Sequence, residues 1–85
     1  VGPKEDLQQS VLFADQLTWT GVPITGMFRG TCSIRYRQQP VACRAELCPD
    51  GRLRVEFDTP QAGVTPGQAV VLYDEDMVIG GGWII

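Results

Sequence analysis

The middle of the chain alternates apolar and polar residues with a period of two in three consecutive segments. These segments span residues 32–38, 41–48 and 52–58. Successive side chains of a strand point to opposite faces, so this period is typical of a β-strand with one buried and one solvated face. The pattern therefore predicts three adjacent strands that share one core.

The turn between the last two segments predicts how they pair. Residues 48–51 read Cys-Pro-Asp-Gly, in which Pro pre-sets a turn and Gly accepts the left-handed conformation of a bulged hairpin. Closing the hairpin there sets Glu46 opposite Arg54 and Arg44 opposite Glu56 on the solvated face. On the apolar face the same register makes three pairs: Leu47 with Leu53, Ala45 with Val55, and Cys43 with Phe57. A one-residue slip would break both patterns, so we predict this register.

A second hairpin is expected just before it. A two-residue turn at residues 39–40 would set Ile34 against Ala45. It would also set Arg35 opposite Arg44, which is a like-charge pair.

Three further strands complete an all-β fold. They are expected over residues 11–19, with an irregularity near Asp15, over 68–73 and over 77–85. The segment 68–73 is almost continuously apolar, which indicates a strand that is central in the sheet or buried on both faces. We expect a loop over residues 24–30, with Met27 and Phe28 exposed, and an acidic turn at residues 74–76. Six short strands without the spacing of helical crossovers indicate a small antiparallel barrel, which is closed and so has no free sheet edge.

Composition agrees with one small globular domain spanning residues 1–85. Apolar residues make up 44% of the chain and charged residues 20%. The net charge is −3, whereas free-standing nucleic-acid binders are usually basic, so RNA contact would need a local patch or a larger protein. No apolar run reaches membrane-spanning length and no signal peptide opens the chain, so we expect no membrane partner. The start at Val1 suggests a fragment of a larger enzyme.

Residues for catalysis or metal binding are scarce. The chain has no His, and its three Cys fit neither a zinc site nor a redox motif. Cys32 and Cys43 fall on apolar faces, so we expect them to be buried and unreactive. The run at residues 80–82 is all glycine but no helix can follow it, so barrel closure or close backbone approach explains it better than a phosphate loop. We therefore predict no catalytic residue, no metal and no cofactor in this domain.

The arginines are the best candidates for a ligand contact. Arg35, Arg37 and Arg44 share one face of the expected hairpin, and Arg44 has Glu56 as a partner. Arg35 and Arg37 have no assignable acidic partner, and a pair of arginines on a rigid sheet suits phosphate. The alternative is a solvated face whose long side chains cover apolar surface.

Several segments together resemble a known family. They are the Val-Gly-Pro-Lys-Glu start, the strand ending at Trp19, Ile-Arg-Tyr-Arg-Gln at 34–38, Phe-Asp-Thr-Pro at 57–60, the run from Val64 to Tyr73 with its Thr-Pro-Gly-Gln, and Ile-Gly-Gly-Gly at 79–82. In this order they resemble the C-terminal domain of the tRNA-specific 2-thiouridylase family over nearly the whole chain.

The resemblance implies a six-stranded barrel, similar to barrels of translation factors, in a cytoplasmic enzyme. Family members use ATP and a persulfide relay to put sulfur on the wobble uridine of tRNA. The ATP site and the catalytic cysteines belong to the N-terminal and central domains, on which a sulfur-donor protein acts. The resemblance also implies that the barrel helps to hold tRNA. It favours Arg35 and Arg37 as RNA contacts, with Arg44, Arg29 and the Gly81 backbone as weaker candidates.

Two alternatives remain open at this stage. In the first, the barrel packs on the parent enzyme without touching RNA, through an apolar docking surface made of Met27, Phe28, Trp83, Ile84 and Ile85. In the second, the chain is a translation-factor-like barrel from an unrelated protein.

Overall fold

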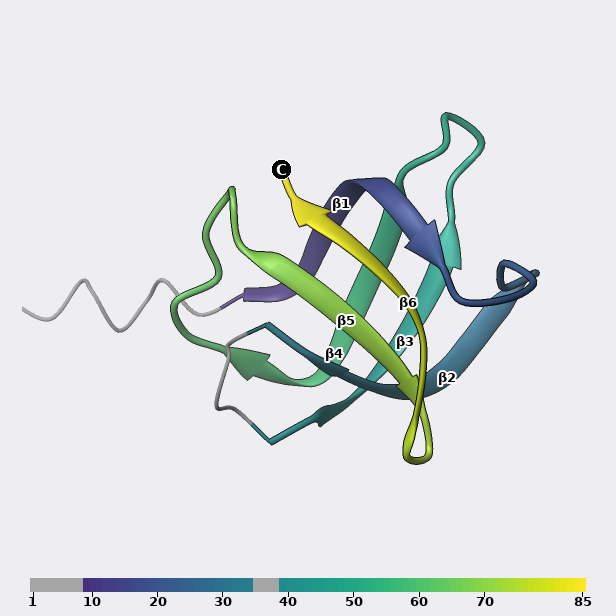
Figure 1. Ribbon diagram of the computed structural model, residues 1–85. Helices are drawn as coiled ribbons and strands as arrows, with labels where there is room; N and C mark the ends of the chain where they lie inside the picture. Colours follow the sequence, from purple (N-terminus) through teal and green to yellow (C-terminus); the bar gives the residue numbers. More distant parts are fainter. Residues whose placement is uncertain (1–8, 35–38) are drawn as a thin grey trace, which may run out of the picture.

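The computed structural model describes residues 9–34 and 39–85, and these form a closed barrel of six antiparallel strands (Figure 1). The strands are β1 (Gln9–Trp19), β2 (Met27–Ser33), β3 (Val41–Leu47), β4 (Leu53–Gln61), β5 (Ala69–Asp74) and β6 (Met77–Ile84). Around the barrel their order is β1-β4-β3-β2-β5-β6, and β6 pairs back onto β1. This confirms the predicted small all-β barrel.

The β3–β4 hairpin has the predicted register. Arg44 lies opposite Glu56 and Glu46 opposite Arg54, while Leu47 and Leu53 meet on the inner face. The turn is closed by a hydrogen bond from the Cys48 amide to the Arg52 carbonyl, at 2.8 Å. Gly51 takes φ 93°, the left-handed conformation that the turn sequence requires.

The register predicted for the β2–β3 hairpin is wrong. Strand β2 already begins at Met27, within the expected loop, and Cys32 pairs with Val41. Residues 34–40 connect the two strands, so Arg29 and not Arg35 lies opposite Arg44. The observed register differs from the predicted one by six residues. An even shift keeps every side chain on its own face, so the alternating pattern cannot distinguish the two.

The irregularity predicted near Asp15 is confirmed, and it lies within the pairing of β1 with β6. Val11–Ala14 pairs with β4, whereas β6 pairs with Ala14 and Asp15 before the irregularity and with Thr18 and Trp19 after it. The register shifts between Asp15 and Thr18, and Gln16 has φ 53°. Such a bulge bends and twists a strand, which here helps β1 to follow the curved wall of the closed barrel.

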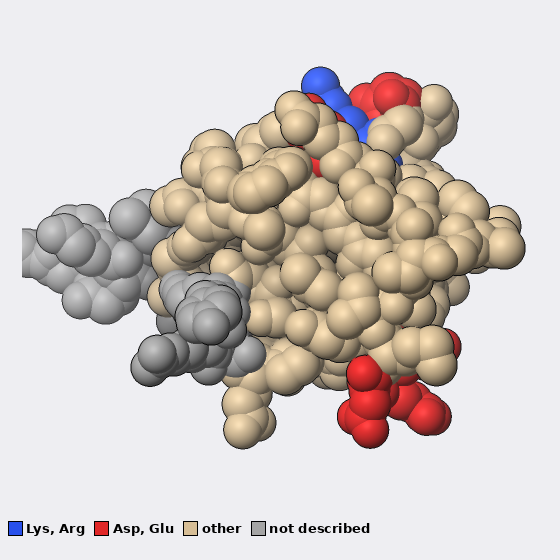
Figure 2. Space-filling view, in the orientation of Figure 1, with Lys and Arg blue, Asp and Glu red and all other residues tan. Residues whose placement is uncertain are grey.

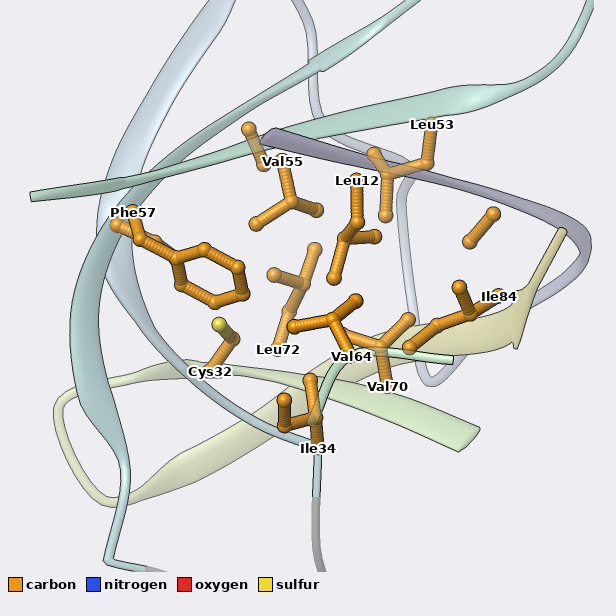
Figure 3. Close-up of a cluster of buried hydrophobic side chains, with 13 residues drawn as sticks. Leu12, Cys32, Ile34, Leu53, Val55, Phe57, Val64, Val70, Leu72 and Ile84 are labelled. Carbon is orange, nitrogen blue, oxygen red and sulfur yellow. The ribbon is translucent and has the colours of Figure 1, made fainter. Parts of the chain in front are cut away.

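The barrel interior is filled by apolar side chains from all six strands, mostly aliphatic, with the ring of Phe57 among them (Figure 3). The largest side chains with no more than 1% exposure are Leu53, Leu72, Val55 and Val70. Burying a side chain of this size contributes on the order of 1.5–3 kcal/mol each. The central position expected for the fifth strand is confirmed, because β5 pairs with β2 and β6. The other expectation, burial on both faces, is wrong, because β5 alternates, with Val71 and Tyr73 partly exposed.

The described residues include no helix that could cross a membrane.

Candidate functional site

Charged side chains gather on the outer side of three neighbouring strands. We call this set the charged face; it consists of Arg29 on β2, Arg44 and Glu46 on β3, and Arg54, Glu56 and Asp58 on β4. Arg29, Arg44 and Glu56 lie in one row across the three strands, because each is directly opposite the next. The alternation of the strands thus brings two weaker RNA candidates, Arg29 and Arg44, next to each other.

Both of these arginines have carboxylate partners. Arg29 donates two hydrogen bonds to Asp58, with Nη2–Oδ2 at 2.6 Å and Nη1–Oδ1 at 3.4 Å. Arg44 Nη2 lies 3.4 Å from Glu56 Oε1, which confirms the predicted pair. The bidentate contact of Arg29 with Asp58 joins β2 to β4 over the top of β3 and was not expected from sequence.

The other described arginines are paired as well. Arg52 contacts Asp50 at 3.6 Å, and Arg54 contacts Glu56 at 3.7 Å in preference to Glu46. Every arginine within residues 9–34 and 39–85 therefore has a carboxylate within 4 Å. A phosphate that bound here would compete with those carboxylates for the guanidinium groups, which weakens the charged face as an anion site.

The two favoured RNA candidates, Arg35 and Arg37, lie outside the described residues, and their RNA contact stays a prediction.

The three glycines of β6 are explained by close backbone approach on both sides. Strand β6 lies between β1 and β5, and Gly81 pairs with Thr18 on one side and Val71 on the other. A Cβ on Gly81 would meet the Val70 carbonyl oxygen, and one on Gly82 would lie 2.6 Å from the Asp15 carbonyl oxygen. Separations under 3 Å are not tolerated by packed atoms, so these positions exclude any side chain.

A hollow lies over the glycines of β6 on the outside of the barrel. We call it the glycine groove; it has a cavity volume of about 280 Å³ and is lined by residues that include Gln16, Thr18, Val71, Val78, Gly81 and Trp83. None of the described residues that line it is charged. Figure 2, which views the molecule from the side of β5 and β6, shows a mostly uncharged surface with acidic residues below it, where the β5–β6 turn lies.

The apolar docking surface predicted from sequence is only partly present. Ile84 is 4% exposed and belongs to the core, and Phe28 is half-buried with its ring over Gly30. Met27 and Trp83 are both exposed, but they lie on β2 and β6, which are not neighbours in the barrel. The expected surface leaves out Val78 and Val71, which line the glycine groove together with Trp83. The position of Val78 opposite Tyr73 depends on the register shift between Leu72 and Tyr73.

Cys32 and Cys43 are fully buried, as predicted, and Cys48 is half-buried. The thiols of the first two contact each other inside the barrel. A hydrogen bond to Cys43, together with burial, raises the pKa of the Cys32 thiol far above its usual range. Because a raised pKa disfavours the reactive thiolate, Cys32 is suited to packing and not to nucleophilic chemistry. Within the described residues, no three His, Cys, Asp or Glu side chains are grouped so that they could hold a metal ion.

Comparison with known proteins gives a consistent match over almost the whole chain. The model of a family described as the aminomethyltransferase β-barrel domain matches residues 9–84. The chain is 48% identical over 84 residues to the tRNA-specific 2-thiouridylase MnmA of Trichlorobacter lovleyi, a match that covers 99% of this chain and 24% of that protein.

Two other relatives bear the same name. The protein of Geobacter metallireducens is 46% identical over 84 residues, covering 99% of this chain and 23% of the relative. The protein of Moorella thermoacetica is 47% identical over 87 residues, covering 99% and 24% respectively. The chain thus spans about a quarter of the length of the curated relatives it matches.

Proposed function

Because this chain belongs to the family of β-barrel domains that form the C-terminal domain of tRNA-specific 2-thiouridylases, we propose that it is an accessory domain that helps to position tRNA. In this proposal the remainder of the enzyme performs the ATP-dependent 2-thiolation of the wobble uridine. The observation that carries the proposal is the match of 43–48% identity over 99% of the chain to relatives whose names state that they act on tRNA.

The chemistry of the reaction is proposed to lie outside this domain. Its relatives are about four times longer, which leaves ample chain for an ATP site and for catalytic cysteines. The buried Cys32–Cys43 pair is unsuited to a sulfur relay, since a thiol that carries sulfur must meet its donor and its substrate. We accordingly propose that ATP and a sulfur-donor protein engage the N-terminal and central domains, in a cytoplasmic enzyme.

Arg35 and Arg37 are the proposed tRNA contacts of the barrel. The support is comparative: Arg29 and Arg44 already neutralise Asp58 and Glu56, so they have less charge to offer a phosphate. Gly81 is a weaker candidate, because its strand is paired on both sides and no cation lines the groove among the described residues.

The test measures the affinity for tRNA at several salt concentrations. It compares the unchanged chain with its Arg35→Ala/Arg37→Ala double variant. If both arginines neutralise phosphates, the double variant should bind more weakly and lower the slope of log K against log salt by about 2. Arg52→Ala/Arg54→Ala is the matched control, because it removes the same charge from arginines that already have carboxylate partners. Equal losses in the two double variants would mean that net charge alone matters and would refute the assigned contacts.

A second candidate function is a barrel that only packs on the parent enzyme. The observation that favours it is the charge balance of the outer wall: each described arginine is paired, while Trp83 is 49% exposed. On this alternative the chain binds tRNA equally with and without Arg35 and Arg37, and the experiment above separates the two functions.

A further inference from the structure

The glycine groove is a preformed and rigid feature of the barrel wall. Its floor is the backbone of β6, which pairs with β1 and β5 at once, and no side chain can grow from Gly81 to fill it. One end is held by Thr20, whose hydroxyl donates a hydrogen bond to the Val78 carbonyl at 3.0 Å. A partner would therefore find the hollow already shaped and would not have to order it.

The walls of the groove expose apolar side chains that a free barrel has no reason to keep together. Trp83 is 49% and Val78 43% exposed, and Val71 lies between them on the neighbouring strand. Scattered exposed apolar residues are ordinary, but a contiguous set around a concave surface marks an interaction site. Tryptophan is also one of the residue types that most often dominate the binding free energy of a protein–protein interface, and Trp83 lies half-exposed beside the hollow.

The charges around the groove indicate what kind of partner fits. No charged side chain lines it among the described residues, but acidic groups flank both ends. Asp15 lies opposite Trp83 at one end, and Asp74, Glu75 and Asp76 form the turn next to Val78 at the other. No ion pair joins these four carboxylates to any described residue. A phosphate backbone would be repelled here, whereas an apolar peptide segment with basic residues at its ends would be complementary.

We propose that the glycine groove is the surface on which an apolar, basic-flanked segment from the rest of the 2-thiouridylase polypeptide docks. The occupant is assigned to the same polypeptide because the chain spans about a quarter of its relatives, so that a barrel of this family has roughly three times its own length of chain beside it. The proposal rests on the family assignment and not on tRNA contact by the barrel.

The test compares this 85-residue chain with a fusion in which it replaces the matching 84 residues of the Trichlorobacter lovleyi relative. Hydroxyl-radical footprinting reads the solvent access of individual side chains in both proteins. In the fusion, modification of Trp83 should fall about fivefold or more. Phe13 and Met27, which are exposed outside the groove, are the matched controls and should change less than about twofold.

A second measurement does not depend on footprinting. Docking couples the stability of the barrel to that of its neighbour, so Trp83→Ser should lower the melting temperature of the fusion more than that of the isolated chain. Met27→Ser, a matched exposed position on β2, should lower both by the same amount. Equal shifts for Trp83→Ser in the two proteins would overturn the proposal.

Three footprinting outcomes would overturn it as well. In the first, Trp83 is as reactive in the fusion as in the isolated chain, so that the groove is open. In the second, Trp83 becomes protected when the concentration of the isolated chain is raised, which would make a second copy of the chain the occupant. In the third, protection appears only when tRNA is added, which would make the occupant a nucleic acid. None of these readouts uses Arg35 or Arg37, so failure here is distinguishable from failure of the proposed tRNA contact.

Discussion

The barrel wall has two sides that cover the same core by different means. On β2, β3 and β4, long arginine and acidic side chains form the charged face, and the arginines are neutralised by carboxylates on the same face. On β1, β6 and β5, three consecutive glycines let the strands approach so closely that no side chain fits, which leaves the uncharged glycine groove. The arginines of the charged face are paired with carboxylates of the same domain, whereas the groove leaves apolar side chains exposed to solvent.

This difference changes what the electrostatics of the molecule suggest. A row containing Arg29 and Arg44 is the natural place to look for phosphate binding, yet its charge is balanced by Asp58 and Glu56. The groove, which carries no charge among the described residues, is the less conspicuous surface, but it is the one with exposed apolar side chains, Trp83 and Val78. Counting arginines on a strand face is therefore a weak guide to anion binding unless their partners are known.

The largest expected effect on stability comes from adding a methyl group to a glycine of β6, on the side of the glycine groove. Gly81→Ala should destabilise the barrel by about 3 kcal/mol or more, because the new Cβ meets backbone atoms of Val70 and Val71 that cannot rotate away. Urea unfolding followed by tryptophan fluorescence measures it. Gly21→Ala is the control, since a Cβ there meets nothing within 4 Å, and it should change stability by less than about 1 kcal/mol. A stable Gly81→Ala barrel would show that close approach is not why β6 carries glycine.

A smaller effect is expected when the pH is raised, because Cys32 and Cys43 meet in the core beneath the charged face. The folded-state pKa of Cys32 is raised above its ordinary value of 9.0, so its contribution to stability is complete below about pH 9. Above that pH the Cys32 thiol ionises in the unfolded chain and not in the folded one, so its contribution to stability should fall by up to about 1.4 kcal/mol per pH unit. The hydrogen bond with Cys32 lowers the pKa of the Cys43 thiol, so Cys43 offsets part of this fall.

Urea unfolding at pH 8 and at pH 10.5 measures this loss. Cys32→Val should reduce the fall. The same fall in Cys32→Val as in the unchanged chain would contradict burial of the Cys32 thiol as its cause.

The smallest effect is expected on the charged face. A double-mutant cycle with Arg29→Ala and Asp58→Ala should give a coupling free energy of about 0.2–1 kcal/mol, since Arg29 is 62% exposed. The coupling should shrink in 1 M salt, because exposed charges are screened. A coupling above about 2 kcal/mol would mean that an ion pair of the charged face contributes as much to stability as the close strand approach at the glycines of β6. The two sides of the barrel would then not differ in what they contribute to stability.

Local patterns allowed the β3–β4 hairpin to be predicted to the residue. Its turn sequence, its cross-strand charge pairs and its apolar alternation all favour one register, and the structure has that register. The neighbouring β2–β3 hairpin had only the alternation and a weak turn signal, and its register was wrong by six residues. The irregularity near Asp15 and the close approach at the glycines were also predictable, because each breaks a strand pattern at one place.

The candidate sites divide in the same way. The pairing of Arg44 with Glu56 followed from the hairpin register, but the contact of Arg29 with Asp58 joins residues 29 positions apart across an intervening strand. The groove likewise needs β1, β5 and β6 side by side, and its wall at Val78 depends on a bulge that no local signal marked.

The sequence alone determined that this protein is a six-stranded all-β barrel with buried cysteines, because alternation and turn chemistry act within a few residues of one another. It also carried the family resemblance, which the comparisons confirmed. Only the tertiary structure decided which arginines are neutralised, that Ile84 points into the core, and that an uncharged groove opens over Gly81. These features depend on which distant strands become neighbours when the barrel closes, and that choice is made by the packing of the whole core.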